Sequence, residues 1–228
     1  MLIDLREARL QRSVTDVLHI LGRGEYAADI TEKLSRTFGQ PSAALEAAEK
    51  DIADVALCDE NAAFALSMAL PLARYMLEED ACAISAVTNM DQARQKLLPH
   101  YLGTHYECGQ MLCLDRNGNF ISCVPLRMGT VDEAPFYLRI ILEEALISGG
   151  ECFIVAHNHP GGTRHPSAED CSSTRNIAQS LSKLEMVLID HIIIADGDAV
   201  SIRASGAIDS SFWAKYAPLP ESFKNWPL

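Results

Sequence analysis

The stretch Ala156-His157-Asn158-His159-Pro160-Gly161-Gly162 is followed, four residues later, by Ser167-Ala168-Glu169-Asp170. A strongly apolar run, Cys152 to Ala156, leads into the first segment, so the two histidines lie where a buried strand is expected to end. Side chains two residues apart on a strand share a face, which directs both imidazoles to one point. Ser167 is expected to open a helix with Asp170 in its first turn. The sequence therefore predicts that a strand, a loop and a helix start bring two imidazoles and one carboxylate together.

Each part of this pattern also has an ordinary structural interpretation. Ser-x-x-Asp is a common helix opening with the serine as N-cap, and Pro-Gly-Gly is ordinary loop sequence. The complete pattern of His-x-His, seven residues, Ser, two residues and Asp is far more restrictive. Three ligands of these types leave a fourth position for water, as in catalytic zinc sites. We therefore predict one Zn²⁺ per chain, held by His157, His159 and Asp170.

The same residues carry a resemblance to a known family. His157-x-His159-Pro160 with Ser167 and Asp170 resembles the JAMM signature of the JAB/MPN metalloprotease superfamily, and His157-Asn158-His159-Pro160 with Pro166-Ser167 is similar to its RadC branch. The resemblance covers about residues 99–208 well and the amino-terminal part weakly. It implies that the two histidines and the aspartate hold zinc, that Ser167 positions or stabilises the oxygen species in catalysis, and that an upstream glutamate is the general base.

A carboxylate outside the metal ligands is needed to take a proton from the attacking water and pass it to the leaving amine. The residues alone leave five glutamates open for this role. Glu107 immediately precedes the first predicted strand of the sheet, where the superfamily places its base, so the resemblance favours Glu107 and leaves Glu151 as the next candidate. The five candidates are Glu107, Glu143, Glu144, Glu151 and Glu169.

Other histidines and the cysteines are assigned by context. His165 lies in the loop before Ser167, where a solvated histidine is expected and a contact with substrate is the alternative. Asp190-His191 interrupts an apolar strand, so His191 is first interpreted as a hydrogen-bonded core residue and second as a support for a metal ligand. The seven cysteines include no Cys-x-x-Cys pair, which argues against a disulfide framework and a thiolate zinc site. Small apolar roles in or beside strands are expected for Cys108, Cys113, Cys123 and Cys152.

Composition limits the class of protein and its partners. With 228 residues, 48% of them hydrophobic, the chain can bury a core and form one or two domains. It has no run of eighteen apolar residues, and charged residues begin at Asp4, so we expect a soluble cytoplasmic protein with no membrane segment. The net charge is −12, with −7 in residues 1–80 and −5 in residues 81–228. Because nucleic-acid affinity depends on basic residues, we expect no binding of nucleic acid.

Residues 1–80 are predicted to form a small helical bundle, because apolar residues recur there at three- and four-residue spacing. RadC-like proteins resemble this region in carrying a helix-hairpin-helix module whose DNA-contacting turn is rich in glycine. At the corresponding place this chain has Ala56-Leu57-Cys58-Asp59-Glu60-Asn61-Ala62-Ala63, with two acids and no glycine. We interpret the region as a degenerate helix-hairpin-helix domain that serves docking or homodimerisation.

The remaining sequence predicts an α+β fold. Residues 81–98 are interpreted as a connector of helix or loop, and residues 99–228 as the metal-binding domain with a carboxyl-terminal tail. Apolar runs on either side of Asn117-Gly118 predict a hairpin, and a helix is expected over 134–147. Apolar strands are expected at 187–195 and 199–202. A sheet flanked by helices fits this order, and the resemblance implies the same α/β sandwich of JAB/MPN type.

Together these observations favour a zinc-dependent hydrolase that cleaves a peptide or isopeptide bond in a protein or peptide substrate, with Glu107 as general base. The alternative is a regulator without catalysis, or one associated with DNA, in which the metal site is structural. The traditional link of the RadC branch with DNA repair motivates this alternative, whereas the acidic charge and the glycine-free turn oppose it.

Overall fold

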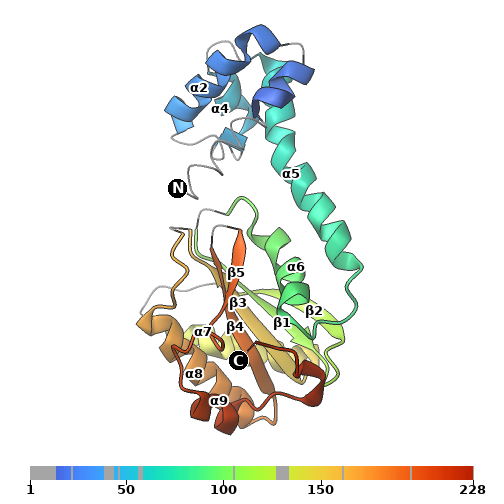
Figure 1. The fold of residues 1–228 in the computed structure, drawn as a ribbon, viewed down its shortest axis with the longest axis vertical. Coiled ribbons are helices and arrows are strands. Elements are labelled where there is room, and N and C mark those ends of the chain that lie inside the picture. Colours follow the sequence, from blue (N-terminus) through green and yellow to red (C-terminus); the bar gives the residue numbers. More distant parts are fainter. Residues whose placement is uncertain are drawn as a thin grey trace. The chain divides into compact units, whose positions relative to one another are not determined.

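The computed structural model describes residues 14–21, 23–38, 44–45, 47–55, 59–104, 106–126, 134–160, 162–195 and 197–227. The chain divides into two compact units, Met1–Met76 and Leu77–Leu228, and the division falls inside the helix α5 (Glu60–Cys82) (Figure 1). None of the helices in these described ranges is long and apolar enough to cross a membrane.

The amino-terminal unit is built from helices. Residues 14–20 are helical, and they are followed by η1 (Gly24–Tyr26), α2 (Ala27–Phe38), α4 (Glu49–Ala53) and the first part of α5. Their apolar faces meet in one core, because the buried residues recur at helical spacing. This core includes Val14, Leu18, Ile30, Leu34, Ile52 and Leu66. The predicted helical bundle is confirmed for the described residues of this unit.

The acidic turn before α5 contributes to the structure of this unit. Residues 56–58 of that turn lie outside the described residues. Asp59 Oδ1 accepts a hydrogen bond of 2.9 Å from the Ala62 N–H at the start of α5, and the carboxylate also forms an ion pair with Arg23. A carboxylate at this position satisfies a free N–H group and favours the helix dipole. Asp59 therefore stabilises the start of α5.

The second unit contains one five-stranded sheet in the order β2-β1-β3-β4-β5. Only β3 and β4 run parallel, and α8 connects them; the other neighbours are antiparallel. The hairpin predicted at Asn117-Gly118 is confirmed, and Gly118 has a φ of +83° that favours glycine. The strands are β1 (Gly109–Leu114), β2 (Phe120–Leu126), β3 (Cys152–Asn158), β4 (Val187–Ala195) and β5 (Asp198–Ser201).

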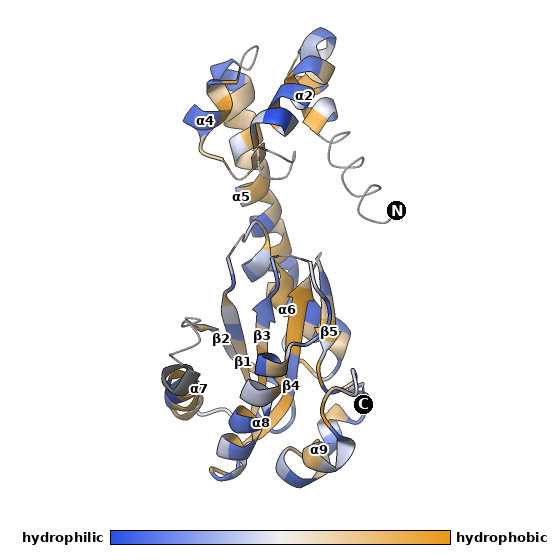
Figure 2. Ribbon diagram, turned by 90° about the vertical axis from the view of Figure 1, so that its left-hand side faces the viewer, coloured by the Kyte–Doolittle hydropathy of each residue, from blue (hydrophilic) through white to orange (hydrophobic). Residues whose placement is uncertain are grey.

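Helices cover both faces of this sheet, and Figure 2 shows the hydrophobic colours of the strands that they enclose. One face, which includes Met111, Phe153 and Val155, packs against α7, α8 and α9. The opposite face, which includes Leu112 and Ile154, packs against α6 and the carboxyl-terminal tail. These helices are α6 (Met90–Tyr101), α7 (Ala134–Ser148), α8 (Ala168–Ser182) and α9 (Ser210–Tyr216), with η3 (Glu221–Phe223) in the tail. The predicted α+β sandwich is confirmed.

The segment interpreted from sequence as a connector at residues 81–98 forms part of the sheet unit. Asn89 caps α6 by accepting a hydrogen bond from the Gln92 N–H, and the helix runs through Pro99 to its end at Tyr101. Ala93 and Leu97 are fully buried against the sheet. The change of composition at Pro99 is therefore not a structural boundary, because the apolar face of α6 spans it.

An irregularity in β4 determines which side chains face the metal centre. Phe153 of β3 pairs with Leu188, but the next residue, Ile154, pairs with Asp190, so β4 carries one extra residue at this point. Such a β-bulge shifts the alternation of side chains between the two faces by one position. As a result His191 pairs with Val155 and lies on the face of α8, whereas Asp190 lies on the opposite face.

Candidate metal centre

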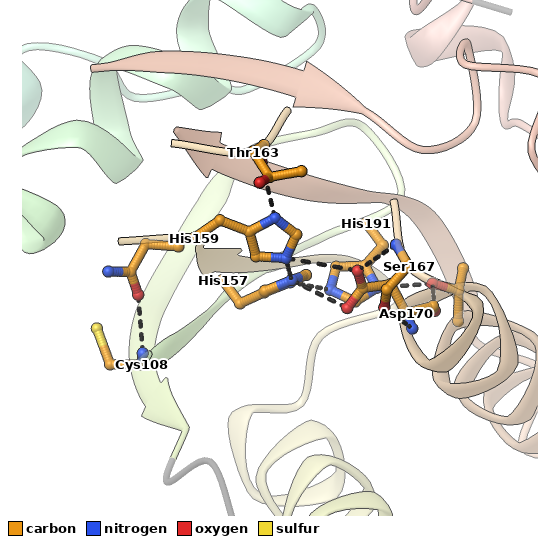
Figure 3. Close-up of polar contacts among 9 residues, drawn as sticks. Cys108, His157, His159, Thr163, Ser167, Asp170 and His191 are labelled. Carbon is orange, nitrogen blue, oxygen red and sulfur yellow. Dashed lines mark hydrogen bonds and ion pairs between the residues drawn. The ribbon is translucent and has the colours of Figure 1, made fainter. Parts of the chain in front are cut away.

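Three elements bring the predicted metal ligands together. His157 is the penultimate residue of β3, His159 follows the end of that strand, and Asp170 lies in the first turn of α8. Figure 3 shows the three side chains turned toward one another. His157 Nε2 lies 2.9 Å from His159 Nε2 and 3.1 Å from Asp170 Oδ1, and His159 Nε2 lies 3.4 Å from Asp170 Oδ2. Within the described part of the chain, this is the one group of three or more potential ligands that meets at a point.

The distances between these donor atoms fit a metal ion. Zinc bonds of about 2.0–2.1 Å in a tetrahedron place neighbouring donors about 3.3 Å apart, close to the 2.9–3.4 Å found here between the two Nε2 atoms and from each of them to an oxygen of the Asp170 carboxylate. Two imidazoles and one carboxylate also form the ligand set of known catalytic zinc sites. The residues present therefore fit a divalent cation with at least one position left for water.

Hydrogen bonds prepare the ring of His159 for this role. Its Nδ1 lies 2.7 Å from the backbone carbonyl oxygen of Thr163, in the loop after β3. Because a carbonyl oxygen only accepts hydrogen bonds, Nδ1 carries the proton and Nε2 of the neutral ring has a free electron pair. The loop thus directs the unprotonated nitrogen of His159 toward the other two ligands.

The ring of His157 is supported by two buried side chains. Its Nδ1 lies 2.8 Å from His191 Nε2, and His191 Nδ1 lies 2.7 Å from the hydroxyl of Thr174 in α8. Burial, together with the neighbouring His157, holds the pKa of His191 well below its ordinary value, so that the ring of His191 is neutral. The second interpretation of His191, as a support for a metal ligand, agrees with these contacts.

Asp170 is held in place by the helix that it helps to start. Its carboxylate accepts a 2.7 Å hydrogen bond from the Ser167 N–H, while the Ser167 hydroxyl accepts a 3.0 Å bond from the Asp170 N–H. Burial alone would raise the pKa of Asp170, but the neighbouring His157, which in its protonated form would donate a hydrogen bond and carry a positive charge, and then the bonds from Ser167 outweigh burial and lower the pKa below its ordinary value. Asp170 is therefore an ionised carboxylate in a fixed orientation.

Ser167 has the structural role that its position in the sequence predicts. It is the N-cap of α8, and with Asp170 it forms a reciprocal capping box. Its side chain is exposed and lies at the same helix start as the carboxylate ligand. The structural role is directly visible, and the catalytic role implied by the resemblance stays a prediction.

Glu107 lies in an exposed segment beside the metal centre. Asn158 holds this segment from both sides: its Oδ1 accepts a 2.8 Å hydrogen bond from the Cys108 N–H, and its Nδ2 donates a 3.0 Å bond to the Tyr106 carbonyl. Gly109 pairs with His157 in the antiparallel register of β1 and β3. Continued for two residues, this register places Glu107 across from His159 and on the face of His157.

The other four candidate bases lie before β3, on α7, and next to Asp170 in the first turn of α8. Glu151 precedes β3 and pairs with Arg116 at 3.2 Å, six residues before His157, which corresponds to about 20 Å along an extended strand. Glu143 pairs with Arg139 on α7. Glu144 also belongs to α7, and Glu169 is exposed on the first turn of α8. Glu107 is the one of these five glutamates that the register of β1 and β3, continued by two residues, places across from a metal ligand, and its role as the base stays a prediction.

His165 and the cysteines lie where the sequence analysis expected them. His165 is exposed in the loop before Ser167. Cys113, Cys123 and Cys152 lie in strands and Cys108 directly precedes β1, as expected for small apolar residues. Burial raises the pKa of each of these four thiols, to about 12 for Cys123 and Cys152. Neutral thiols are poor metal ligands, which agrees with a site built from histidine and aspartate.

Three supporting residues escaped prediction from the sequence. Thr174 and Thr163 have no sequence signal that separates them from other threonines. Asn158 lies between the two predicted ligands, and nothing in the sequence indicates that its side chain holds the segment around Glu107. His191 had a signal, namely a polar pair inside an apolar strand. The bulge that turns His191 toward His157 depends on strand pairing, which the sequence of β4 alone does not determine.

Comparisons with known proteins agree with this geometry. Residues 87–207 match the family model described as a RadC-like JAB domain. The chain is 36% identical over 183 residues to a UPF0758 protein of Bordetella bronchiseptica, covering 79% of this chain and 80% of the relative. It is 32% identical over 184 residues to a UPF0758 protein of Acidithiobacillus ferrooxidans, covering 80% and 82%. The matched range starts before α6, which agrees with the packing of that helix on the sheet.

Proposed function

The chain belongs to the RadC-like JAB domain family, and from this premise and the geometry of the metal centre we propose that it is a zinc-dependent hydrolase of the JAMM type. It would cleave a peptide or isopeptide bond. His157, His159 and Asp170 would hold one zinc ion per chain, and Glu107 would act as the general base. When bound, zinc supplies Lewis acidity, which makes a water more acidic and polarises a carbonyl group.

One observation carries this proposal. The protein commits the Nδ1 atoms of both histidines to hydrogen bonds with Thr163 and His191, and leaves the two Nε2 atoms and an ionised carboxylate facing one point. Three electron pairs directed at one point repel each other unless a proton or a cation lies between them. In a metal site the bound cation removes this repulsion, whereas in an apolar core nothing would compensate it.

The protein residues around the ion have separate tasks in the proposed reaction. Glu107 would accept a proton from the attacking water and deliver it to the leaving nitrogen, which needs a carboxylate that does not ligate the metal. Ser167 would orient or stabilise the oxygen atoms at the reacting carbon, from the helix start that also carries Asp170. The bond that breaks is the amide C–N bond, and the products are a carboxylic acid and an amine.

The test separates metal binding from catalysis. We expect the purified chain to contain one zinc ion, and the His157→Ala/His159→Ala variant to contain none, as measured by elemental analysis. Glu107→Gln should keep the metal and the fold, while hydrolysis on a panel of peptide and isopeptide substrates falls by ~10²–10⁴-fold. Glu169→Gln is a matched control, because Glu169 is an exposed acid at the start of α8 whose loss should leave turnover unchanged.

Two outcomes would contradict the proposal. Full turnover by zinc-loaded Glu107→Gln would show that another group is the base. Tight zinc binding without turnover by the unaltered chain on any substrate of the panel would favour a regulator with a structural metal. A mobility shift of duplex DNA by the full chain that persists near 150 mM salt would link that regulator to DNA, against the expectation from its acidic charge.

A further inference from the structure

Thr174 lies one helical turn after Asp170, and its side chain is fully buried. Its Oγ1 lies 2.6 Å from the backbone carbonyl oxygen of Asp170. The carbonyl oxygen can only accept, so the single hydroxyl proton of Thr174 is donated to it. The orientation of this proton is therefore set by the backbone of α8.

The direction of the next two hydrogen bonds follows from this one. Thr174 Oγ1 also lies 2.7 Å from His191 Nδ1, and because the hydroxyl proton is already used, Nδ1 must donate. The neutral ring of His191 then has an electron pair on Nε2, which lies 2.8 Å from His157 Nδ1 and accepts its proton. His157 consequently has no proton on Nε2, the atom 3.1 Å from Asp170 Oδ1.

We propose that Thr174 and His191 are positioning residues that fix the tautomer of His157 and thereby set the affinity of the site for its metal ion. This inference rests on the proposed metal site. The chain of hydrogen bonds begins at the Asp170 carbonyl oxygen and ends at His157, whose Nε2 lies beside the Asp170 carboxylate, so Asp170 both orients the chain and completes the ligand set.

A comparison of the two histidine ligands explains why His157 needs such support. His159 donates to a carbonyl oxygen, which cannot reverse the direction of the bond. His157 donates to another imidazole, and a pair of imidazoles can exchange the roles of donor and acceptor. In the reversed direction the proton of His157 would lie on Nε2, where the metal binds. The hydroxyl of Thr174 removes this competing arrangement.

The first experiment measures zinc affinity of the full chain by competition with a chelator. Thr174→Val keeps the shape of the side chain but removes the acceptor for His191 Nδ1, and we expect zinc affinity to fall ~10–100-fold. Thr174→Ser should restore affinity to within a few-fold. Thr31→Val is the matched control, because buried Thr31 makes the same hydrogen bond to the carbonyl four residues earlier, in the helical unit, and it should not change zinc affinity.

The second experiment reads the tautomer directly, from imidazole ¹⁵N chemical shifts of the metal-free chain. We expect a proton on Nδ1 of His157 in the unaltered protein, and a population with the proton on Nε2 in Thr174→Val. A metal-free unaltered chain with His157 protonated on Nε2, or a folded Thr174→Val variant with unchanged zinc affinity, would overturn the inference while leaving the proposed hydrolase intact. Absence of turnover with the predicted affinity changes would overturn the hydrolase alone, and absence of zinc binding by the unaltered chain would overturn both.

Discussion

Asp190 and His191 are adjacent in β4, yet they belong to two different buried polar networks on opposite faces of the sheet. Asp190 accepts hydrogen bonds from the His191 and Arg203 backbone N–H groups, from the Ser201 hydroxyl and from Trp226 Nε1. His191 instead joins Thr174 to His157. Both side chains are at least 97% buried, so burial does not distinguish them.

The two networks differ in how they end. Around Asp190 four donors meet one carboxylate, and no electron pair is directed toward open space. The His191 network ends at His157 Nε2, which faces two other unprotonated ligand atoms. A buried polar group surrounded by partners stabilises the fold, whereas a network that ends in several convergent acceptors prepares a binding site. The comparison predicts that substitutions in the two networks change different measurable properties.

The largest effect is expected for Asp190→Ala. Four buried donors would lose their acceptor, and each unsatisfied buried group costs ~1–3 kcal/mol, so the free energy of unfolding should fall by about 4 kcal/mol or more. Urea unfolding of the metal-free chain measures this loss. Zinc affinity of the fraction that remains folded should be unchanged. A variant that is stable but has lost zinc would show that the two networks are not separate.

Asp170→Asn is expected to lower zinc affinity and to leave the stability almost unchanged, which is the reverse of the result expected for Asp190→Ala. The amide can still accept the hydrogen bond from the Ser167 N–H, so the stability of the metal-free chain should change little. Loss of the charged ligand should lower zinc affinity more than the ~10–100-fold typical of a supporting residue, which exceeds about 2.7 kcal/mol of binding free energy. Calorimetric titration with zinc and a melting curve of the metal-free chain give the two values. Equal losses in both would place Asp170 in the structural network instead.

A smaller loss of stability is expected for Trp226→Phe. The substitution keeps most of the aromatic packing on the sheet but removes one of the four donors to Asp190. Hydrogen bonds to charged groups contribute ~1.5–3 kcal/mol, so the free energy of unfolding should fall by about that amount. Zinc affinity should stay the same. Unchanged stability would mean that the carboxyl-terminal tail does not help to hold the buried carboxylate.

The sequence predicted the parts of this comparison that depend on local patterns. The run of apolar residues before His157 indicated a buried strand, Asn117-Gly118 indicated a hairpin, and Ser167 with Asp170 indicated a helix start; the structure has all three. The convergence of the three metal ligands followed from the same local elements, because a strand end and the following helix start lie close together in space.

Features that depend on pairing between distant strands were beyond the sequence. Asp190 and His191 were recognised only as a polar pair within an apolar strand, and strict alternation cannot tell which of them faces which side once a bulge adds one residue. The interpretation of residues 81–98 as a connector missed the role of α6 for a similar reason. This helix is recognised as part of the sheet unit only from the core residues that it buries. Local periodicity predicts the type of an element, but the elements that pack against it are determined by tertiary structure.

The smallest effect is expected for Ser167→Ala, and it sharpens the comparison because Ser167 belongs to the helix start that carries a metal ligand. Loss of an N-cap serine costs ~1 kcal/mol, since the Asp170 N–H loses its acceptor. The reciprocal bond from the Ser167 backbone N–H to the Asp170 carboxylate survives the substitution, so the ligand keeps its orientation and zinc affinity should fall less than tenfold. Melting curves of the metal-free and the zinc-loaded chain separate these contributions, because a pure capping role lowers both melting temperatures equally. A larger decrease in the zinc-loaded chain would show that the hydroxyl also orients the ligand, and would place Ser167 in the network that ends at the metal.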